Sequence, residues 1–92
     1  MNSFPLKISS PEGDLFCGEA NSLSVRGTEG ELAVMAGHVP FVSYVKPCLC
    51  RLVLPDGSRR EGKTSGGILT VSKEQVILLS GSFSWVEGSP SF

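Results

Sequence analysis

The stretch LCRLVLPDG, residues 49 to 57, contains the two features that decide the fold. Its residues alternate between two faces, with Leu49, Arg51 and Val53 on one of them, and a period of two residues is typical of a β-strand. The Pro-Asp-Gly sequence at 55–57 predicts a tight turn, because proline presets one backbone dihedral angle and glycine tolerates a positive one. The stretch therefore predicts a strand and a turn into a second strand.

Short runs with the same period recur along the chain, separated by Gly, Pro, Asn or Asp about every eight to twelve residues. The expected strands are residues 6–8, 15–17, 22–26, 31–34, 42–46, 49–54, 58–64, 68–71, 75–79 and, as an additional strand, 83–86. The segment 58–64 is polar and charged, which is typical of an exposed edge strand. No window has the 3.6-residue period of a helix, and many short strands favour a β-sandwich or a barrel.

Length, charge and cysteine content limit the classes of protein to consider. The chain has 92 residues, which predicts one small domain, and its 8 Lys and Arg against 9 Asp and Glu argue against a nucleic-acid binder. No run approaches the roughly 20 apolar residues of a membrane-spanning helix, and the first residues lack the basic start and apolar core of a secretion signal. Three cysteines, an odd number, fit a reduced, cytosol-like compartment.

His38 is the only histidine of the chain, and histidine is the side chain whose ordinary pKa lies near neutrality. Its neighbours Gly37, Val39 and Pro40 include no nucleophile and no acid. A catalytic triad can still assemble from residues far apart in the sequence. We expect no catalytic residue, and we interpret His38 as a loop or contact residue.

A zinc site is another alternative, because three cysteines and His38 supply four ligands. The cysteines are Cys17, Cys48 and Cys50. Alternate residues of a strand point to one face without the turn of a zinc knuckle, so we expect no metal and no cofactor. The glycine-rich stretch 64–67 lacks the lysine and hydroxyl ending of a P-loop, and paired glycines before a strand are typical of a bulge or a close backbone approach.

Two charged groups have more than one interpretation. Glu29 and Glu31 are spaced like a pair of acid–base carboxylates, but nothing else in the chain completes such a site, and a solvated acidic turn is the simpler interpretation. Arg59, Arg60 and Lys63 fit either an acidic partner or a charged edge strand, and we favour the edge strand.

The order of the motifs resembles a known family. The chain contains, in this order, P-E-G, E-G-E-L-A-V-M-A-G-H-V-P at 29–40, K-P, D-G, S-G-G-I-L-T-V at 65–71 and V-I-L-L. This order is similar to the N-terminal domain of the epsilon subunit of F-type ATP synthases, called delta in mitochondria, over roughly residues 5 to 80. Three positions depart from the family pattern. Ala33 and Cys48 stand where the family usually has glycine, and Ala36 stands where it usually has proline.

The resemblance implies an all-β fold, a ten-stranded β-sandwich of two five-stranded sheets, over residues 1–81. It implies a non-catalytic rotor subunit of the central stalk that binds the gamma subunit and the polar loops of the membrane c-ring, and couples proton or sodium translocation to ATP synthesis. The c-ring contacts that it implies are Glu29, Glu31, Gly37 and His38. A carboxylate at Glu31 suits the basic residue that these loops carry in the family. We expect a peripheral subunit at the cytoplasmic face of a bacterial inner membrane.

The end of the chain departs from the resemblance. The family usually continues into a two-helix hairpin that restrains ATP hydrolysis, whereas residues 80–92 read SGSFSWVEGSPSF. We therefore expect residues 82–92 to be a short, partly flexible extension with no hairpin. The alternative function is a small β-sandwich module that binds a ligand through Tyr44, Phe83 and Trp85, and a less favoured one is a hydrolase or metalloprotein that uses His38.

Overall fold

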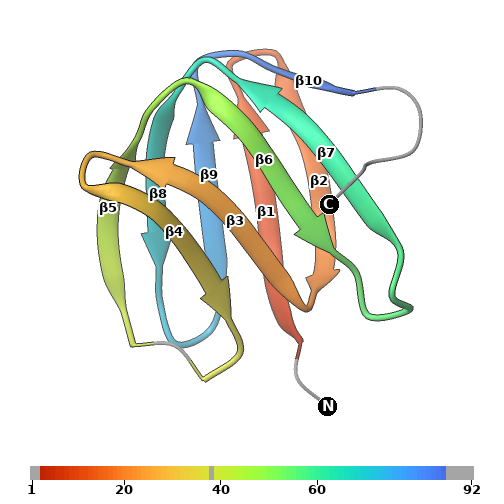
Figure 1. The fold of residues 1–92 in the computed structure, drawn as a ribbon. Coiled ribbons are helices and arrows are strands. Elements are labelled where there is room, and N and C mark those ends of the chain that lie inside the picture. Colours follow the sequence, from red (N-terminus) through yellow and green to blue (C-terminus); the bar gives the residue numbers. More distant parts are fainter. Residues whose placement is uncertain (1–2, 38, 87–92) are drawn as a thin grey trace.

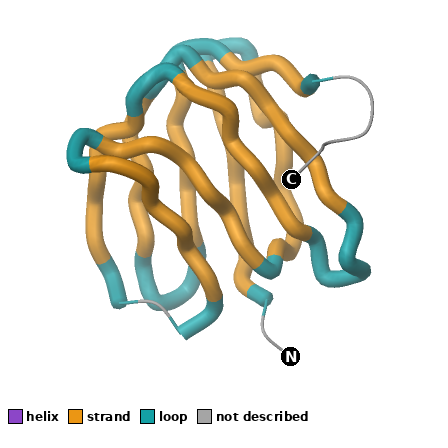
Figure 2. The backbone as a smooth tube through the Cα atoms, viewed as in Figure 1, coloured by secondary structure: helices purple, strands orange, loops and turns teal. Residues whose placement is uncertain are grey.

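The computed structural model describes residues 3–37 and 39–86, which form ten β-strands (Figure 1, Figure 2). The strands are β1 (Phe4–Ser10), β2 (Gly13–Ala20), β3 (Ser22–Gly27), β4 (Gly30–Met35), β5 (Phe41–Val45), β6 (Cys48–Val53), β7 (Arg59–Thr64), β8 (Gly67–Val71), β9 (Val76–Ser80) and β10 (Phe83–Trp85). Every segment predicted as a strand overlaps one of them, which confirms the all-β class. No helix that could cross a membrane occurs in the described residues.

The strands hydrogen-bond into one continuous ten-stranded sheet, which folds over at the contact between β3 and β5 into two facing five-stranded halves, the sandwich that was predicted (Figure 1). We call the half with the order β4-β3-β6-β7-β10 the first sheet, and the half with the order β5-β8-β9-β1-β2 the second sheet. Neighbouring strands are antiparallel except β1 and β9, which are parallel. The sheets meet where Gly27 of β3 pairs with Val45 of β5, and there the Lys46 N–H donates to the Arg26 carbonyl at 2.8 Å. This contact closes one side of the sandwich.

The strand at 58–64 is covered along its residues 62–64 by a further strand, so the prediction of an edge strand was wrong for that half. β7 pairs with β6 on one side and with β10 on the other. The edge is covered by a strand of only three residues, which lies after the predicted domain end at residue 81. The sandwich thus continues past residue 81, and the rest of the predicted extension, residues 87–92, lies outside the described residues.

Inward-facing side chains of both sheets form one core. In β1, for example, Phe4, Leu6 and Ile8 are buried while the residues between them are more exposed, which is the period of two that the sequence displays. The buried apolar residues are Phe4, Leu6, Ile8, Ala20, Leu23, Val25, Val34, Val45, Cys50, Leu52, Leu69, Val71, Val76 and Leu78.

An aromatic cluster joins the two sheets on the side away from the contact between β3 and β5. The Trp85 ring lies edge-on to the rings of Phe16 and Phe83, at centroid distances of 6.3 and 5.0 Å. The Arg60 guanidinium lies 3.8 Å from the Trp85 ring centroid, so this arginine contributes to the fold rather than to a basic surface. Gly62 makes room for the cluster, because a Cβ there would overlap the Phe83 ring.

Candidate functional site

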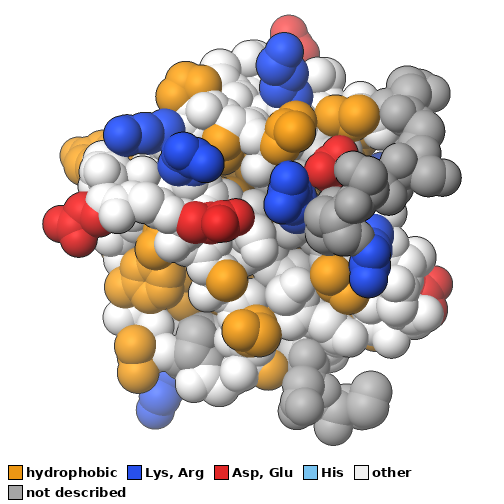
Figure 3. Space-filling view, in the orientation of Figure 1, with side chains coloured by type: hydrophobic (Ala, Val, Ile, Leu, Met, Phe, Trp, Pro, Cys, Tyr) orange, Lys and Arg blue, Asp and Glu red, His pale blue; other side chains and the backbone are white. Residues whose placement is uncertain are grey.

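Glu29 and Glu31 lie at the tip of the hairpin formed by β3 and β4. Gly27 pairs with Gly30, so Thr28 and Glu29 form a two-residue turn, and Gly30 has a φ of +125°, a conformation that glycine adopts readily. Both glutamates are exposed, and Figure 3 shows acidic side chains over this hairpin. The hairpin tip, which we call the acidic turn, presents two carboxylates to solvent.

Gly37 lies at the other end of β4 (Figure 1). The strand has six residues, and at about 3.3 Å per residue it is about 17 Å long. Gly37 follows it with a φ of +84° and is exposed, while His38 lies outside the described residues. Among the described members of the predicted set, the structure therefore separates Gly37 from Glu29 and Glu31 by the length of β4. The physical reason is that an entire extended strand lies between the two motifs.

The outer face of β5, β8 and β9 is apolar, and it was not predicted from the sequence. Tyr44 pairs with Ile68, which pairs with Leu79, so the three side chains form a row across the sheet. Tyr44 is 70% exposed, Leu79 is 51% exposed, and Val42, on the same face of β5, is 68% exposed. We call these four residues the apolar face. A contiguous exposed apolar surface on a small protein marks an interaction site. The signal in the sequence was V-I-L-L, in which apolar residues fill both faces of a strand.

The glycine-rich stretch 64–67 belongs to a hydrogen-bonded joint between the two sheets. The Gly66 N–H donates to Thr64 Oγ1 at 3.0 Å, and the hydroxyl oxygens of Thr64 and Ser80 lie 2.5 Å apart. Ser80 Oγ donates to the Ser82 carbonyl at 2.6 Å. Because this bond uses the single hydroxyl proton of Ser80, the Thr64 hydroxyl is the donor to Ser80. The backbone donor of Gly66, which a phosphate cradle needs, is therefore already engaged.

The three cysteines do not converge on one site. Cys17 is exposed on β2 in the second sheet, whereas Cys48 and Cys50 lie on β6 in the first. Burial raises the pKa of the Cys50 thiol to about 12, with a smaller contribution from the neighbouring Cys48. Cys48 Sγ accepts the Arg26 N–H at 3.4 Å, near the point where β3 leaves β6 and meets β5. Among the described residues, no group of three or more His, Cys, Asp or Glu could hold a metal ion.

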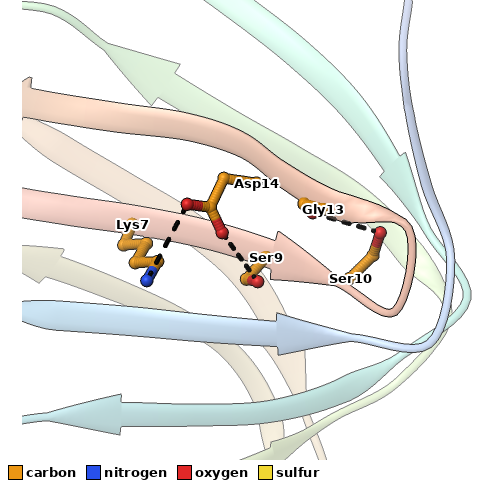
Figure 4. A network of polar contacts seen from close by, with 5 residues as sticks. All are labelled: Lys7, Ser9, Ser10, Gly13 and Asp14. Carbon is orange, nitrogen blue, oxygen red and sulfur yellow. Dashed lines mark hydrogen bonds and ion pairs between the residues drawn. The ribbon is translucent and has the colours of Figure 1, made fainter.

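Asp14 makes its contacts within the hairpin of β1 and β2 (Figure 4). Its carboxylate lies 3.8 Å from Lys7 Nζ and accepts a hydrogen bond from Ser9 Oγ at 3.0 Å. Ser10 Oγ donates to the Gly13 carbonyl at 3.4 Å, at the end of the same hairpin. These contacts fix the shape of the hairpin, and they assign Asp14 a structural role.

Two of the three aromatic residues considered for ligand binding are used in the fold. Phe83 and Trp85 are half-buried in the cluster with Phe16 and Arg60. Only Tyr44 presents its ring to solvent, and it lies on the apolar face. The three aromatic residues therefore do not line a common ligand site.

Comparison with known proteins agrees with this fold. The model of the family "ATP synthase, Delta/Epsilon chain, beta-sandwich domain" matches residues 3–86. The ATP synthase epsilon chain of Clostridium novyi (strain NT) is 34% identical over 85 residues, which cover 92% of this chain and 65% of the relative. The chain thus spans somewhat less than two thirds of the length of this curated relative.

Solved structures share the architecture at lower identity. A chain of the Euglena gracilis mitochondrial ATP synthase, in an assembly of OSCP, F1 and c-ring, superposes with a TM-score of 0.85 at 20% identity, covering 90% of this chain and 53% of its own length. A chain of the Tetrahymena thermophila mitochondrial ATP synthase, in a structure of the central stalk and c-ring, superposes with a TM-score of 0.72 at 8% identity. The match covers 88% of this chain and 65% of that chain. These likenesses show the fold. By the family match and the Clostridium relative, the chain belongs to the ATP synthase delta/epsilon family, and residues 3–86 form its β-sandwich domain.

Proposed function

We propose that this chain is a non-catalytic central-stalk subunit of an F-type ATP synthase that links the gamma subunit to the c-ring and couples ion translocation to ATP synthesis. Family membership supports the assignment to the synthase. The Tetrahymena structure is described as a central stalk with a c-ring, which is the setting we propose for this chain. In a bacterium such a subunit would be peripheral, at the cytoplasmic face of the inner membrane.

The apolar face carries the proposal, because it is the surface that fits a permanent protein partner. Tyr44 is 70% exposed and lies in line with Ile68 and Leu79 across three strands. Interface anchors are enriched in tyrosine, and side chains that are apolar and exposed in the free chain gain most from being covered. We assign this face to the gamma subunit.

The acidic turn is the second surface, and we assign it to the c-ring loops. Glu29 and Glu31 are exposed at a hairpin tip, and a basic loop residue would be attracted to their carboxylates. Since Gly37 lies at the other end of β4, we restrict the ring contact to the two glutamates. The acidic turn lies between β3 and β4 and the apolar face lies on β5, β8 and β9, so the two proposed contacts use different strands.

Binding of the purified gamma subunit tests the assignment of the apolar face. We expect Tyr44→Ser and Val42→Ser each to weaken binding at least about tenfold, because each removes apolar contact area from the interface. Val86→Ser is the matched control for Val42→Ser, since Val86 is also exposed (42%) but lies outside the apolar face. Absence of binding at micromolar concentration, or equal effects of the two valine variants, would overturn the assignment.

A further inference from the structure

Two of the three cysteines form a pair on β6. Cys48 and Cys50 are separated by one residue of an extended strand, so their side chains point to the same face of the sheet. Cys50 is buried, whereas Cys48 is partly exposed and packs against the core. A hydrogen bond joins the two side chains. The fold therefore brings two thiols into contact.

The pair lies where the pairing between β3 and β6 ends. The last paired residues are Ser24 and Arg51, and β3 then leaves β6 and meets β5. Beyond that point the Arg26 N–H donates to Cys48 Sγ at 3.4 Å, so a side chain replaces the missing strand partner. Cys48 is also among the residues that line a hollow of about 480 Å³ on the surface. Solvent and small ions can therefore reach the pair from the side of Cys48.

A bridge made by one ion suits this spacing better than a disulfide does. Alternate residues of a strand lie about 6.6 Å apart, at about 3.3 Å per residue, and their Cβ atoms point in the same direction. A disulfide requires Cβ atoms roughly 3.5 to 4.5 Å apart, so it would distort β6. A metal ion placed between the two sulfurs spans a longer distance and leaves the strand extended.

The number and type of ligands select the ion. In the part of the chain that the structure describes, no group of three or more His, Cys, Asp or Glu surrounds a common point, so the pair stands as two ligands. Zinc ordinarily takes four ligands, whereas soft thiolate ligands select Cu(I), which is stable with two. Two thiolates around Cu(I) carry one net negative charge. Arg26 and Arg51 line the same hollow as Cys48, and nearby positive charge favours an anionic group.

We propose that Cys48 and Cys50 form a binding site for one monovalent copper ion, with one sulfur of each residue as its two ligands. Binding forms two Cu–S bonds and releases the two thiol protons to solvent, and the oxidation state of copper does not change. The site goes beyond the proposed function and does not depend on it, because it uses neither the apolar face nor the acidic turn. Cys48 stands where the family usually has glycine, so relatives with that glycine lack the pair.

Competition for Cu(I) tests the site. The full chain, reduced and kept free of oxygen, is titrated into the coloured complex of Cu(I) with bicinchoninate, and the loss of colour measures the copper that it takes up. We expect the chain to take up one ion. Cys48→Ser and Cys50→Ala should each weaken binding by about 100-fold or more, since even a residue that only supports a metal ligand contributes roughly 10- to 100-fold.

Cys17→Ser is the matched control, because it removes one exposed thiol that lies outside the pair. It should bind Cu(I) like the original chain. Unchanged affinity in Cys48→Ser or in a folded Cys50→Ala, or an equal loss in Cys17→Ser, would overturn the proposal. Thermal unfolding verifies the fold of each variant. If Cys50→Ala does not fold, the serine variants at the two other cysteines decide.

The original chain alone provides a second test, which does not depend on any variant. X-ray absorption at the copper edge of the loaded chain should show two sulfur neighbours and no second copper. Three sulfurs, or a copper neighbour, would indicate a cluster shared between chains and would overturn the site. Zn²⁺ offered at the same concentration should not bind, since the pair lacks two of the four ligands that zinc requires. Zinc binding as tight as copper binding would overturn the choice of ion.

Discussion

Thr-Glu-Gly-Glu at 28–31 and Thr-Ser-Gly-Gly at 64–67 are both short polar stretches with a threonine and glycine, and they differ in their structural surroundings. The first is exposed, and its side chains make no hydrogen bond or ion pair with the rest of the described chain. In the second, Thr64 is 2% exposed and its hydroxyl is bonded on both sides, by Gly66 and Ser80. A polar, glycine-containing stretch therefore stabilises the fold when its groups find partners in the interior, and stays available to another molecule when they remain in solvent.

The contrast assigns different effects to mutations in the two stretches. A buried polar group that loses its partner keeps the cost of its desolvation, so changes at the joint should appear in the free energy of unfolding. An exposed carboxylate has no such cost, so changes at the acidic turn should appear in binding alone.

The largest effect is expected for Gly67→Ala. A Cβ there would overlap the Leu79 carbonyl oxygen, so β8 and β9 must separate, and the free energy of unfolding should fall by about 3 kcal/mol or more. Urea denaturation followed by the fluorescence of Trp85 measures the loss. Gly18→Ala is the control within a strand, since its Cβ would lie 3.6 Å from the Phe16 ring, an ordinary contact. Equal losses in both variants would contradict the special role of the joint.

The next effect is expected for Thr64→Val, which keeps the volume of the side chain and removes its hydroxyl. Ser80 loses its donor and the Gly66 N–H loses its acceptor, so unfolding should become easier by about 1 to 3 kcal/mol. The same denaturation experiment applies, with Thr70→Val as a control on an outer face. Combining Thr64→Val with Ser80→Ala should cost less than the sum of the two, because both remove the same bond. Strict additivity would argue against the bond.

Ionisable side chains show the same division between interior and surface. Burial raises the pKa of Cys50 from 9.0 to about 12, so the folded chain holds the thiol proton over a range in which the unfolded chain loses it. The resulting stability is fully present below pH 9.0 and is lost as the pH rises toward about 12, by about 1.4 kcal/mol per pH unit. Cys50→Ala should flatten the fall of unfolding free energy between pH 9.0 and about 11 relative to the original chain. If the unfolding free energy of the variant and of the original chain fell equally steeply with pH, the raised pKa of the buried Cys50 thiol would be contradicted.

The strands were predictable because their pattern is local. LCRLVLPDG became β6 and its turn, in which Asp56 accepts hydrogen bonds from Ser58 Oγ at 2.6 Å and from the Ser58 N–H at 2.9 Å. These bonds lower the pKa of the Asp56 carboxyl. The pairing of β10 with β7 was not predictable, because partners far apart in the chain share no local period. The division into two five-stranded sheets came from the family resemblance.

The candidate site also has one part that was predictable from the sequence and one part that was not. The acidic turn was predictable as an exposed hairpin tip, because glycines flank its carboxylates. The apolar face was not, since an apolar residue in a strand is ordinarily assigned to the core. Only the register places Tyr44, Ile68 and Leu79 in one row on the outside. Cys48 stands where the family usually has glycine, and the structure gives its side chain a role, because its sulfur accepts the Arg26 N–H.

The smallest effect on the fold is expected for Glu31→Lys, because this variant changes the exposed stretch 28–31 and leaves the buried joint at 64–67 unchanged. The side chain is exposed, so the free energy of unfolding should change by no more than about 0.5 kcal/mol. Binding of the gamma-bound chain to the c-ring should nevertheless fall about tenfold or more, because attraction to a basic loop becomes repulsion. Lys73→Glu reverses a charge in the turn between β8 and β9, at the opposite end of the sandwich from the acidic turn, and should affect neither quantity. If Glu31→Lys destabilises the chain as much as Thr64→Val does, the acidic turn also belongs to the fold, and the contrast between the two stretches disappears.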